Sequence, residues 1–194
     1  MFYRLALWVM PPGQMRLPLT LIFLTLLSCS ERQKSDTKTL DFKDFTIQVP
    51  ATWQQIKAKG VDSFVGQLAL DNGDTASFDL GWYSNSLDDE SVYVDSNGDV
   101  YLVDNKSNPK FYGKADTVDI EKLKINKIKF TTIDGKRAKI IQPKRTGKGM
   151  TGVYFDSLWT KGSGTDRFQM NAENLDSDNE KRLLEAFETL KFNK

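Results

Sequence analysis

The residues able to do chemistry are few, because the chain holds a single cysteine, Cys29, and no histidine. Nucleophilic catalysis of the Ser-His-Asp or Cys-His kind therefore lacks its base. A zinc site built from histidines and several cysteines is excluded for the same reason. What remains is the chemistry of one thiol, or of paired carboxylates, and no spaced acidic motif points to such a pair. The sequence thus predicts a protein that is not an enzyme and that uses no cofactor and no metal.

The single thiol follows an export-signal pattern. Residues 17–27 read LPLTLIFLTLL after Arg16, and this apolar run is shorter than the about 20 residues that span a bilayer. The next segment, Leu26-Leu27-Ser28-Cys29, resembles the bacterial lipobox, with Leu27 where a small residue is more usual. The resemblance implies that residues 1–28 are a lipoprotein signal peptide, cut before Cys29, and that Cys29 carries the lipid.

Two points about the leader stay open. An ordinary secretory signal is the alternative, but no A-x-A cleavage site lies nearby. The segment Pro11-Pro12-Gly13 interrupts the apolar stretch before it, and Met15 begins a compact signal by itself. Translation therefore starts at either Met1 or Met15.

Residues 29–44 are polar and charged after the cysteine, which predicts a lipidated tether with a span of roughly 20 Å. Acyl chains on Cys29 would hold the protein at the cell envelope. Ser30 favours an outer-membrane destination in a Gram-negative cell, on the periplasmic or the outer surface. Loss of the leader removes two basic residues, Arg4 and Arg16, and leaves the mature chain close to neutral. This balance gives no electrostatic reason to expect nucleic-acid binding.

The remaining residues, 45–194, predict a single α+β domain rich in antiparallel strands. Alternating or apolar runs predict strands at 45–49, 64–70, 75–83, 92–94, 100–103, 124–132 (with a bulge), 137–142, 150–159 and 166–172. Turn sequences join several of these runs, as at 71–74, Asn97-Gly98 and Asp134-Gly135. A capping box, Ser177-x-x-Glu180, opens a helix with an apolar stripe at its close. A shorter helix is predicted near the N-terminus, from Trp53 to Ala58.

The order of these pieces resembles the PsbP-like superfamily. The resemblance rests on FTIQVPATW at residues 45–53, TTIDGKRAKII at 131–141, and the closing helix that runs into TLKF at 189–192. It covers about residues 42–192, although the stretch 84–121 matches nothing in the pattern. Membership would imply an α/β/α sandwich, in which helices cover both faces of an antiparallel sheet. It would also imply a non-catalytic binding or assembly factor, on the strength of the fold alone.

Two segments are candidates for a partner surface. Tyr93 and Tyr101 flank the small predicted hairpin, and aromatic residues at such places contribute strongly to protein interfaces. Lys144, Arg145 and Lys148 lie in a glycine-containing loop that could face anionic groups. This loop resembles part of a phosphate-binding motif, but a strand and not a helix is predicted to follow it.

Two acidic segments have simpler explanations than metal binding. The spacing Asp95-x-Asn97-Gly98-Asp99 differs from that of a calcium loop, which places glycine sixth and glutamate twelfth. A hairpin turn accounts for these residues. The run from Asp88 to Glu90 is interpreted as solvated loop charge.

The leading hypothesis is a membrane-anchored, non-catalytic lipoprotein that binds or helps assemble a protein partner at the cell envelope. One alternative is an immunity-type lipoprotein that neutralises a periplasmic toxin. A second alternative is a carboxylate-dependent hydrolase, which would need a pocket with two carboxylates about 5–10 Å apart.

Overall fold

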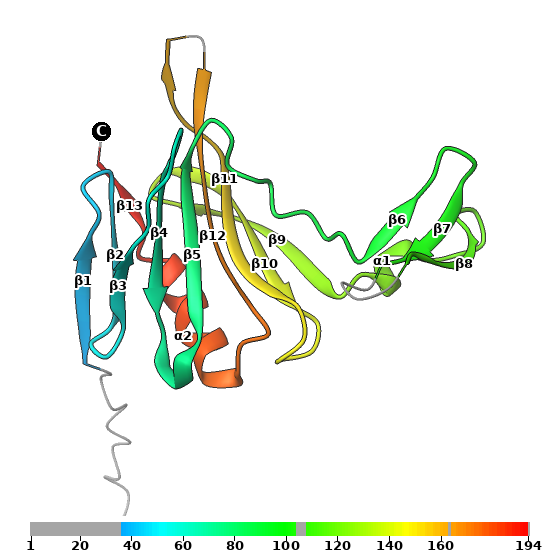
Figure 1. Ribbon diagram of the computed structural model, residues 1–194, viewed down its shortest axis with the longest axis horizontal. Helices are drawn as coiled ribbons and strands as arrows, with labels where there is room; N and C mark the ends of the chain where they lie inside the picture. The colour runs from blue at the N-terminus through cyan, green and yellow to red at the C-terminus, as the bar shows by residue number, and fades with distance from the viewer. Residues whose placement is uncertain (1–35, 104–107, 163, 194) are drawn as a thin grey trace, which may run out of the picture. The chain divides into compact units, whose positions relative to one another are not determined.

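A seven-stranded antiparallel sheet forms the centre of the computed structural model, which describes residues 36–103, 108–162 and 164–193 (Figure 1). In spatial order its strands are β3 (Gln54–Lys57), β4 (Phe64–Ala69), β5 (Thr75–Gly81), β12 (Gly164–Glu173), β11 (Met150–Lys161), β10 (Lys136–Pro143) and β9 (Asn126–Ile133). A one-turn helix, η1 (Asp71–Gly73), joins β4 to β5. The antiparallel sheet predicted from the alternating runs is confirmed.

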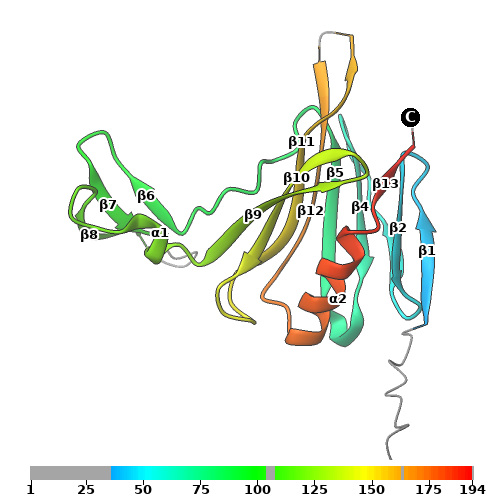
Figure 2. The same ribbon diagram turned by 180° about the vertical axis from the view of Figure 1, so that it is seen from behind.

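One face of this sheet packs against two other elements. The first is a three-stranded sheet of β1 (Thr37–Asp41), β2 (Phe45–Pro50) and β13 (Lys191–Phe192), with β2 in the middle. The second is the helix α2 (Ser177–Phe187), which contacts both β2 and β11. Figure 2 shows α2 lying across the strands of the large sheet on this side. The packing of the sheet with a C-terminal helix is therefore confirmed.

Phenylalanine rings fill the space between the layers. Phe168 of β12 lies within ring contact of Phe45 at 4.9 Å, Phe192 at 5.4 Å and Phe155 at 6.1 Å between centroids. All of these pairs, like the Phe45–Phe78 pair at 5.1 Å, meet edge to face, which is a favoured aromatic geometry. Four strands from both sheets and the last residues of the chain thus share one core.

The predicted tether ends earlier than expected. Residues 37–41 form β1, which pairs with β2 along its whole length, and Phe42 is buried against Phe45 with stacked rings 4.7 Å apart. The folded unit therefore includes β1 and does not begin at Phe45. The polar residues that suggested a tether lie on the solvent side of a half-buried strand. The predicted signal peptide and the lipid attachment at Cys29 lie outside the described residues.

The predicted N-terminal helix is wrong. Residues 54–57 form the edge strand β3 paired with β4, because main-chain pairing with a neighbouring strand outweighs a weak helical preference. Trp53 is fully buried, and its indole nitrogen donates a hydrogen bond to the Asp71 carboxylate at 3.2 Å. Among the described residues, helices on both faces of the large sheet are not seen, so the three-layer sandwich remains an expectation from the resemblance.

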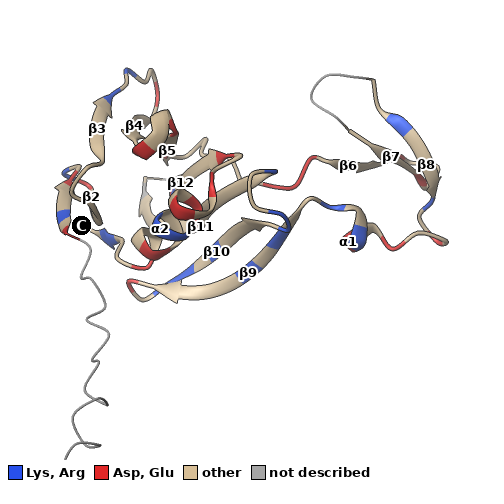
Figure 3. Cartoon of the chain, turned by 90° about the horizontal axis from the view of Figure 1, so that it is seen from below, with Lys and Arg blue, Asp and Glu red and all other residues tan. Residues whose placement is uncertain are grey.

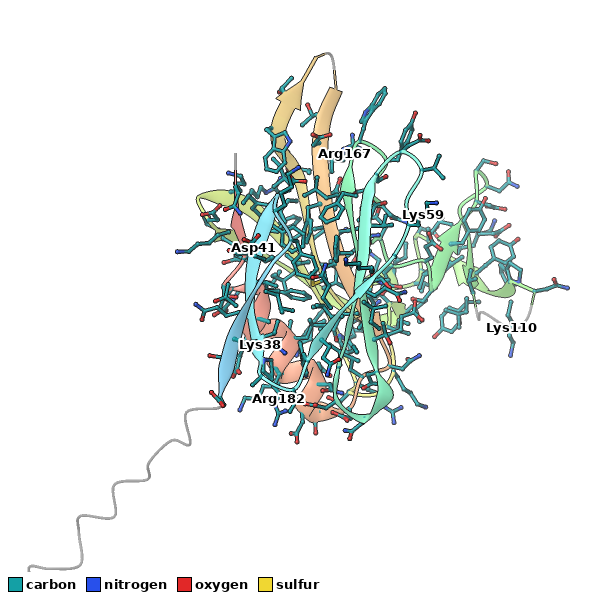
Figure 4. All side chains as sticks on the ribbon, turned by 60° about the vertical axis from the view of Figure 1, so that its left-hand side comes forward. Lys38, Asp41, Lys59, Lys110, Arg167 and Arg182 are labelled. Carbon is teal, nitrogen blue, oxygen red and sulfur yellow. The ribbon has the colours of Figure 1, made fainter. Side chains whose placement is uncertain are left out.

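The helix α2 forms as predicted but begins one residue earlier. Asp176, not Ser177, is its N-cap, with the carboxylate accepting from the main-chain nitrogens of Asp178 and Asn179 at 3.0 and 2.8 Å. Glu180 does not complete a capping box; it is buried and accepts a hydrogen bond from the Gln142 side chain at 2.8 Å. Arg182, labelled in Figure 4, anchors the helix to η1 through an ion pair with Asp71 at 2.9 Å.

The opposite face of the large sheet is crossed by residues 84–91, named here the strap. Ser84 donates from its hydroxyl to the carbonyl of Asp79 in β5 at 2.9 Å. Leu87 is buried over Gly152 of β11, where an added Cβ would lie 2.9 Å from the leucine side chain. At its far end the Asp89 carboxylate accepts from the main-chain nitrogen of Asn126, at the start of β9, at 2.8 Å. The strap therefore spans the sheet from β5 to β9.

A lysine clamps the strap at its middle. The Nζ of Lys139 in β10 donates to the carbonyl of Ser86 at 2.9 Å and to the Asp88 carboxylate at 2.6 Å. The hydrogen bond from Lys139, assisted by one from Ser86, holds the pKa of Asp88 below its ordinary value of 3.8. The acidic run from Asp88 to Glu90 was interpreted from the sequence as solvated charge. In the structure, Asp88 and Asp89 instead hold the strap on the sheet through hydrogen bonds.

This clamp predicts a pH dependence. Because the pKa of Asp88 is lower in the folded state, its stabilisation is present above pH 3.8 and is lost as the pH falls through the lowered value. Asp88→Asn should lower the free energy of unfolding at pH 7 by less than about 1 kcal/mol, the size found for exposed pairs. Urea unfolding at pH 7 and at pH 2.5 measures this difference, which should be smaller at the lower pH. Asp156→Asn, at a looser pair with Arg137 of 4.0 Å, should show a smaller difference at pH 7. A constant difference across both pH values for Asp88→Asn would contradict the clamp.

Candidate partner-binding surface

A second, smaller sheet carries the aromatic residues singled out in the sequence. Its strands are β6 (Val92–Val94), β7 (Asp99–Leu102) and β8 (Lys110–Lys114), with β7 in the middle. The hairpin of β6 and β7 and its turn at Asn97-Gly98 are confirmed. The strand β8 was missed, and it is followed by the short helix α1 (Ile120–Leu123).

Three aromatic rings form a row across this small sheet, and the three residues are named here the aromatic row. Tyr93 lies directly opposite Tyr101, and Tyr101 lies directly opposite Phe111. The ring centroids are 6.1 and 5.9 Å apart, within the range of favourable cross-strand aromatic pairs. Tyr93 and Phe111 at the two ends are 55% and 56% exposed. The row is therefore ordered by its own contacts and still open to solvent.

The other face of the small sheet explains why these rings point outward. Val100, next to Tyr101 in β7, is fully buried, and successive side chains of a strand point to opposite faces. Gly113 of β8 lies so near Val118 that an added Cβ would approach the valine to 2.9 Å. The small apolar core thus takes the valines, and the larger rings are left on the open face.

The turn between β6 and β7 is held by Asp95. Its carboxylate accepts from the main-chain nitrogens of Asn97 and Asp99 at 2.9 and 2.8 Å, as aspartates at the start of turns commonly do. Gly98 has a φ of 77°, which favours glycine there. These contacts confirm the interpretation as a turn. No cluster of three or more acidic, histidine or cysteine residues able to hold a metal occurs in the described part of the chain.

Charged groups border the aromatic row at one end. Asp99 and Lys114 form an ion pair at 2.6 Å, and this hydrogen bond raises the pKa of Lys114. Partial burial raises the pKa of the Tyr101 phenol, and the nearby Asp95 and Asp99 carboxylates add to the effect. The Tyr101 hydroxyl therefore stays protonated at neutral pH and can donate a hydrogen bond.

The basic loop predicted at 144–149 is present and is followed by strand β11, as expected. Lys144 is not free, because its Nζ donates to the carbonyl of Glu121 in α1 and its main-chain nitrogen donates to that of Ile125 at 2.8 Å. Arg145 and Lys148 form an isolated bridge with each other, and both are exposed. Of the three predicted cationic residues, Arg145 and Lys148 are thus the two whose side chains remain available to contact a partner.

The structure brings some of the predicted surface residues together and leaves others apart. Tyr93 and Tyr101 are neighbours, but among the described residues no hydrogen bond, ion pair or ring contact joins them to Lys144, Arg145 or Lys148. Two aromatic residues of β8, Phe111 and the half-exposed Tyr112, were missed. Two adjacent aromatic residues favour a strand and could have indicated β8. The surrounding stretch, however, was interpreted as irregular.

A cavity of about 640 Å³ between the strap and β12 tests the alternative of paired carboxylates. Its acidic lining residues are Asp88, Asp89, Glu90 and Glu173, but Asp88 already accepts a hydrogen bond from Lys139 and Asp89 accepts one from Ser91. A general acid of a hydrolase needs a raised carboxyl pKa. The carboxyl groups with a displaced pKa in the described residues, those of Asp88, Asp119 and Asp176, are all shifted downward. This geometry gives the hydrolase alternative no support.

Figure 3 shows basic residues spread along β9 and β10, with acidic residues on α2 and on the loops. No helix in the described ranges is long and apolar enough to cross a membrane. No family model, no curated protein and no solved structure matches the chain.

Proposed function

We propose that the protein is a membrane-anchored, non-catalytic lipoprotein that binds a protein partner at the cell envelope through the aromatic row. The observation that carries the proposal is the exposure of Tyr93 and Phe111 on a sheet whose other face already has its own buried core. Rigid aromatic side chains lose little conformational entropy on binding and contribute strongly to protein interfaces. Membrane attachment rests on the lipobox resemblance around Cys29.

A protein partner fits this surface better than a small ligand does. The rings lie on one face of a three-stranded sheet, bordered by the Asp99–Lys114 pair, and an aromatic centre with a polar rim is the usual anatomy of a protein interface. Among the described residues β8 is an edge strand of this sheet, and a strand of a partner can pair with such an edge. The immunity hypothesis is the special case in which that partner is a toxin.

Site-directed crosslinking in the native cell tests the proposal. A photoreactive amino acid at position 93 or 111 of the lipidated chain should crosslink to one and the same protein. The same amino acid at the exposed position 132, on the large sheet, should not. Adding Tyr101→Ala to the chain labelled at 111 should reduce the product about tenfold, the size expected for loss of a central aromatic contact.

Circular dichroism should show that the substituted chains remain folded, because the labelled side chains are half exposed. Equal crosslinking at positions 93 and 132, or none at 93 and 111, would contradict the aromatic row as a partner surface.

A further inference from the structure

A groove of about 660 Å³ lies at one end of the large sheet, apart from the aromatic row. Residues from four distant segments line it, including the loop before β4, the end of β5 and the neighbouring parts of β11 and β12. Gly81 allows the loop to pack closely, since an added Cβ would meet the Ser63 side chain at 3.0 Å. Its volume is that of a small-molecule site and not of a protein interface.

Aromatic rings supply the apolar part of this groove. Trp82 and Tyr83 are 55% and 71% exposed, with ring centroids 5.3 Å apart and planes tilted by 32°. Trp159 and Phe64 also line the groove. The sequence predicted a strand over residues 75–83, but β5 ends at Gly81, and both rings are exposed. Nothing in the proposed partner surface uses them.

The charged groups that line the groove are all carboxylates, namely those of Asp44, Asp62 and Asp166. Asp166 accepts a hydrogen bond from the Trp159 indole nitrogen at 2.7 Å, which fixes that ring. No ion pair joins Asp44 or Asp62 to another described residue. Lys59 and Arg167, both labelled in Figure 4, are close in sequence to the lining but are not part of it. Arg167 points to the opposite face from Asp166, because neighbours in a strand alternate.

We propose that this groove binds a small organic cation, such as an alkylammonium or a quaternary ammonium compound. A cation is attracted to the faces of Trp and Tyr rings and gains further from nearby carboxylates, which form no ion pair with another described residue. A neutral sugar would also stack on these aromatic rings but would leave the negative charge of the groove without a counterpart. The inference stands independently of the partner surface, because it uses different residues on a different sheet.

Titration calorimetry on the full mature chain in detergent tests this inference, with choline as the probe at constant ionic strength. Saturable binding of one choline per chain is expected. The neutral isostere 3,3-dimethylbutan-1-ol should bind at least about tenfold more weakly, and glucose should not bind. Trp82→Ala should weaken choline binding about tenfold, and Asp62→Asn several-fold.

Phe130→Ala, at an exposed phenylalanine of β9 that lines neither the groove nor the aromatic row, is the matched control and should leave the choline affinity unchanged. Circular dichroism should show that Trp82→Ala is folded, since that side chain is largely exposed. Absence of saturable choline binding, equal binding of the neutral isostere, or binding of glucose alone would each overturn the proposal. These outcomes do not depend on whether the aromatic row binds a protein.

Discussion

Phe168→Ala should remove about 3–5 kcal/mol of the free energy of unfolding, the range measured for large aromatic truncations in protein cores. Phe168 is fully buried, and its ring contacts rings from β2, β5, β11 and β13. The expected loss is a large share of the about 5–15 kcal/mol that stabilises an average domain. Urea denaturation followed by tryptophan fluorescence measures it.

Phe130→Ala is the matched control for this experiment. Phe130 is a phenylalanine of the same sheet, but it is 54% exposed on the edge strand β9, where Arg137 lies over its ring at 4.2 Å. Its removal should cost about 0.5–1 kcal/mol. Similar losses for the two variants would show that the layers do not share the single aromatic core described above.

Cys29→Ala should abolish lipid modification of the chain entirely, because the thiol is the one nucleophile that the lipobox resemblance offers for acylation. The unmodified chain should keep its leader, since processing of lipoprotein signals follows acylation. Intact-mass spectrometry of the protein from its native membrane, together with labelling by a fatty-acid analogue, provides the measurement.

Ser28→Ala is the control for processing, because it keeps a small residue before the cysteine and should be cut and acylated normally. A natural protein with a free sulfur at position 29, or Cys29→Ala chains that still take up the label, would refute both the anchor and the proposed location.

Local patterns predicted the parts of the fold that local forces determine. The turns at Asn97-Gly98 and Asp134-Gly135 were predicted because glycine, asparagine and aspartate tolerate a positive φ. Residues 98, 134 and 135 do adopt a positive φ. The helix α2 was predicted from its apolar stripe. Its cap was misplaced by one residue, since Asp176 and Ser177 are both good N-caps and the contact of Asn72 with Asp176, at 2.7 Å, is invisible in the sequence.

The missed elements depend on contacts between distant segments. The strands β1, β3 and β8 are short, and each is stabilised by pairing with a neighbour. The bulge predicted in β9 is absent from its pairing with β10, while β11 contains one between Phe155 and Trp159. No single-sequence pattern reports which strand lies beside which.

Of the candidate sites, too, the part set by local sequence was predicted and the part built from distant segments was not. Tyr93 and Tyr101 were predicted to flank one small hairpin, and the structure places them directly opposite each other. The groove was not predicted, since Asp44, Asp62 and Asp166 come from three segments far apart in the chain. The strap over Gly152 was missed for the same reason.

The placement of β2 between β1 and β13 joins the two ends of the folded chain in one sheet. Because Phe192 supplies part of the aromatic core, this core stays incomplete until Phe192 of β13 has been synthesised. Since synthesis proceeds from the N-terminus, the aromatic core can therefore form completely only after β13 has been made.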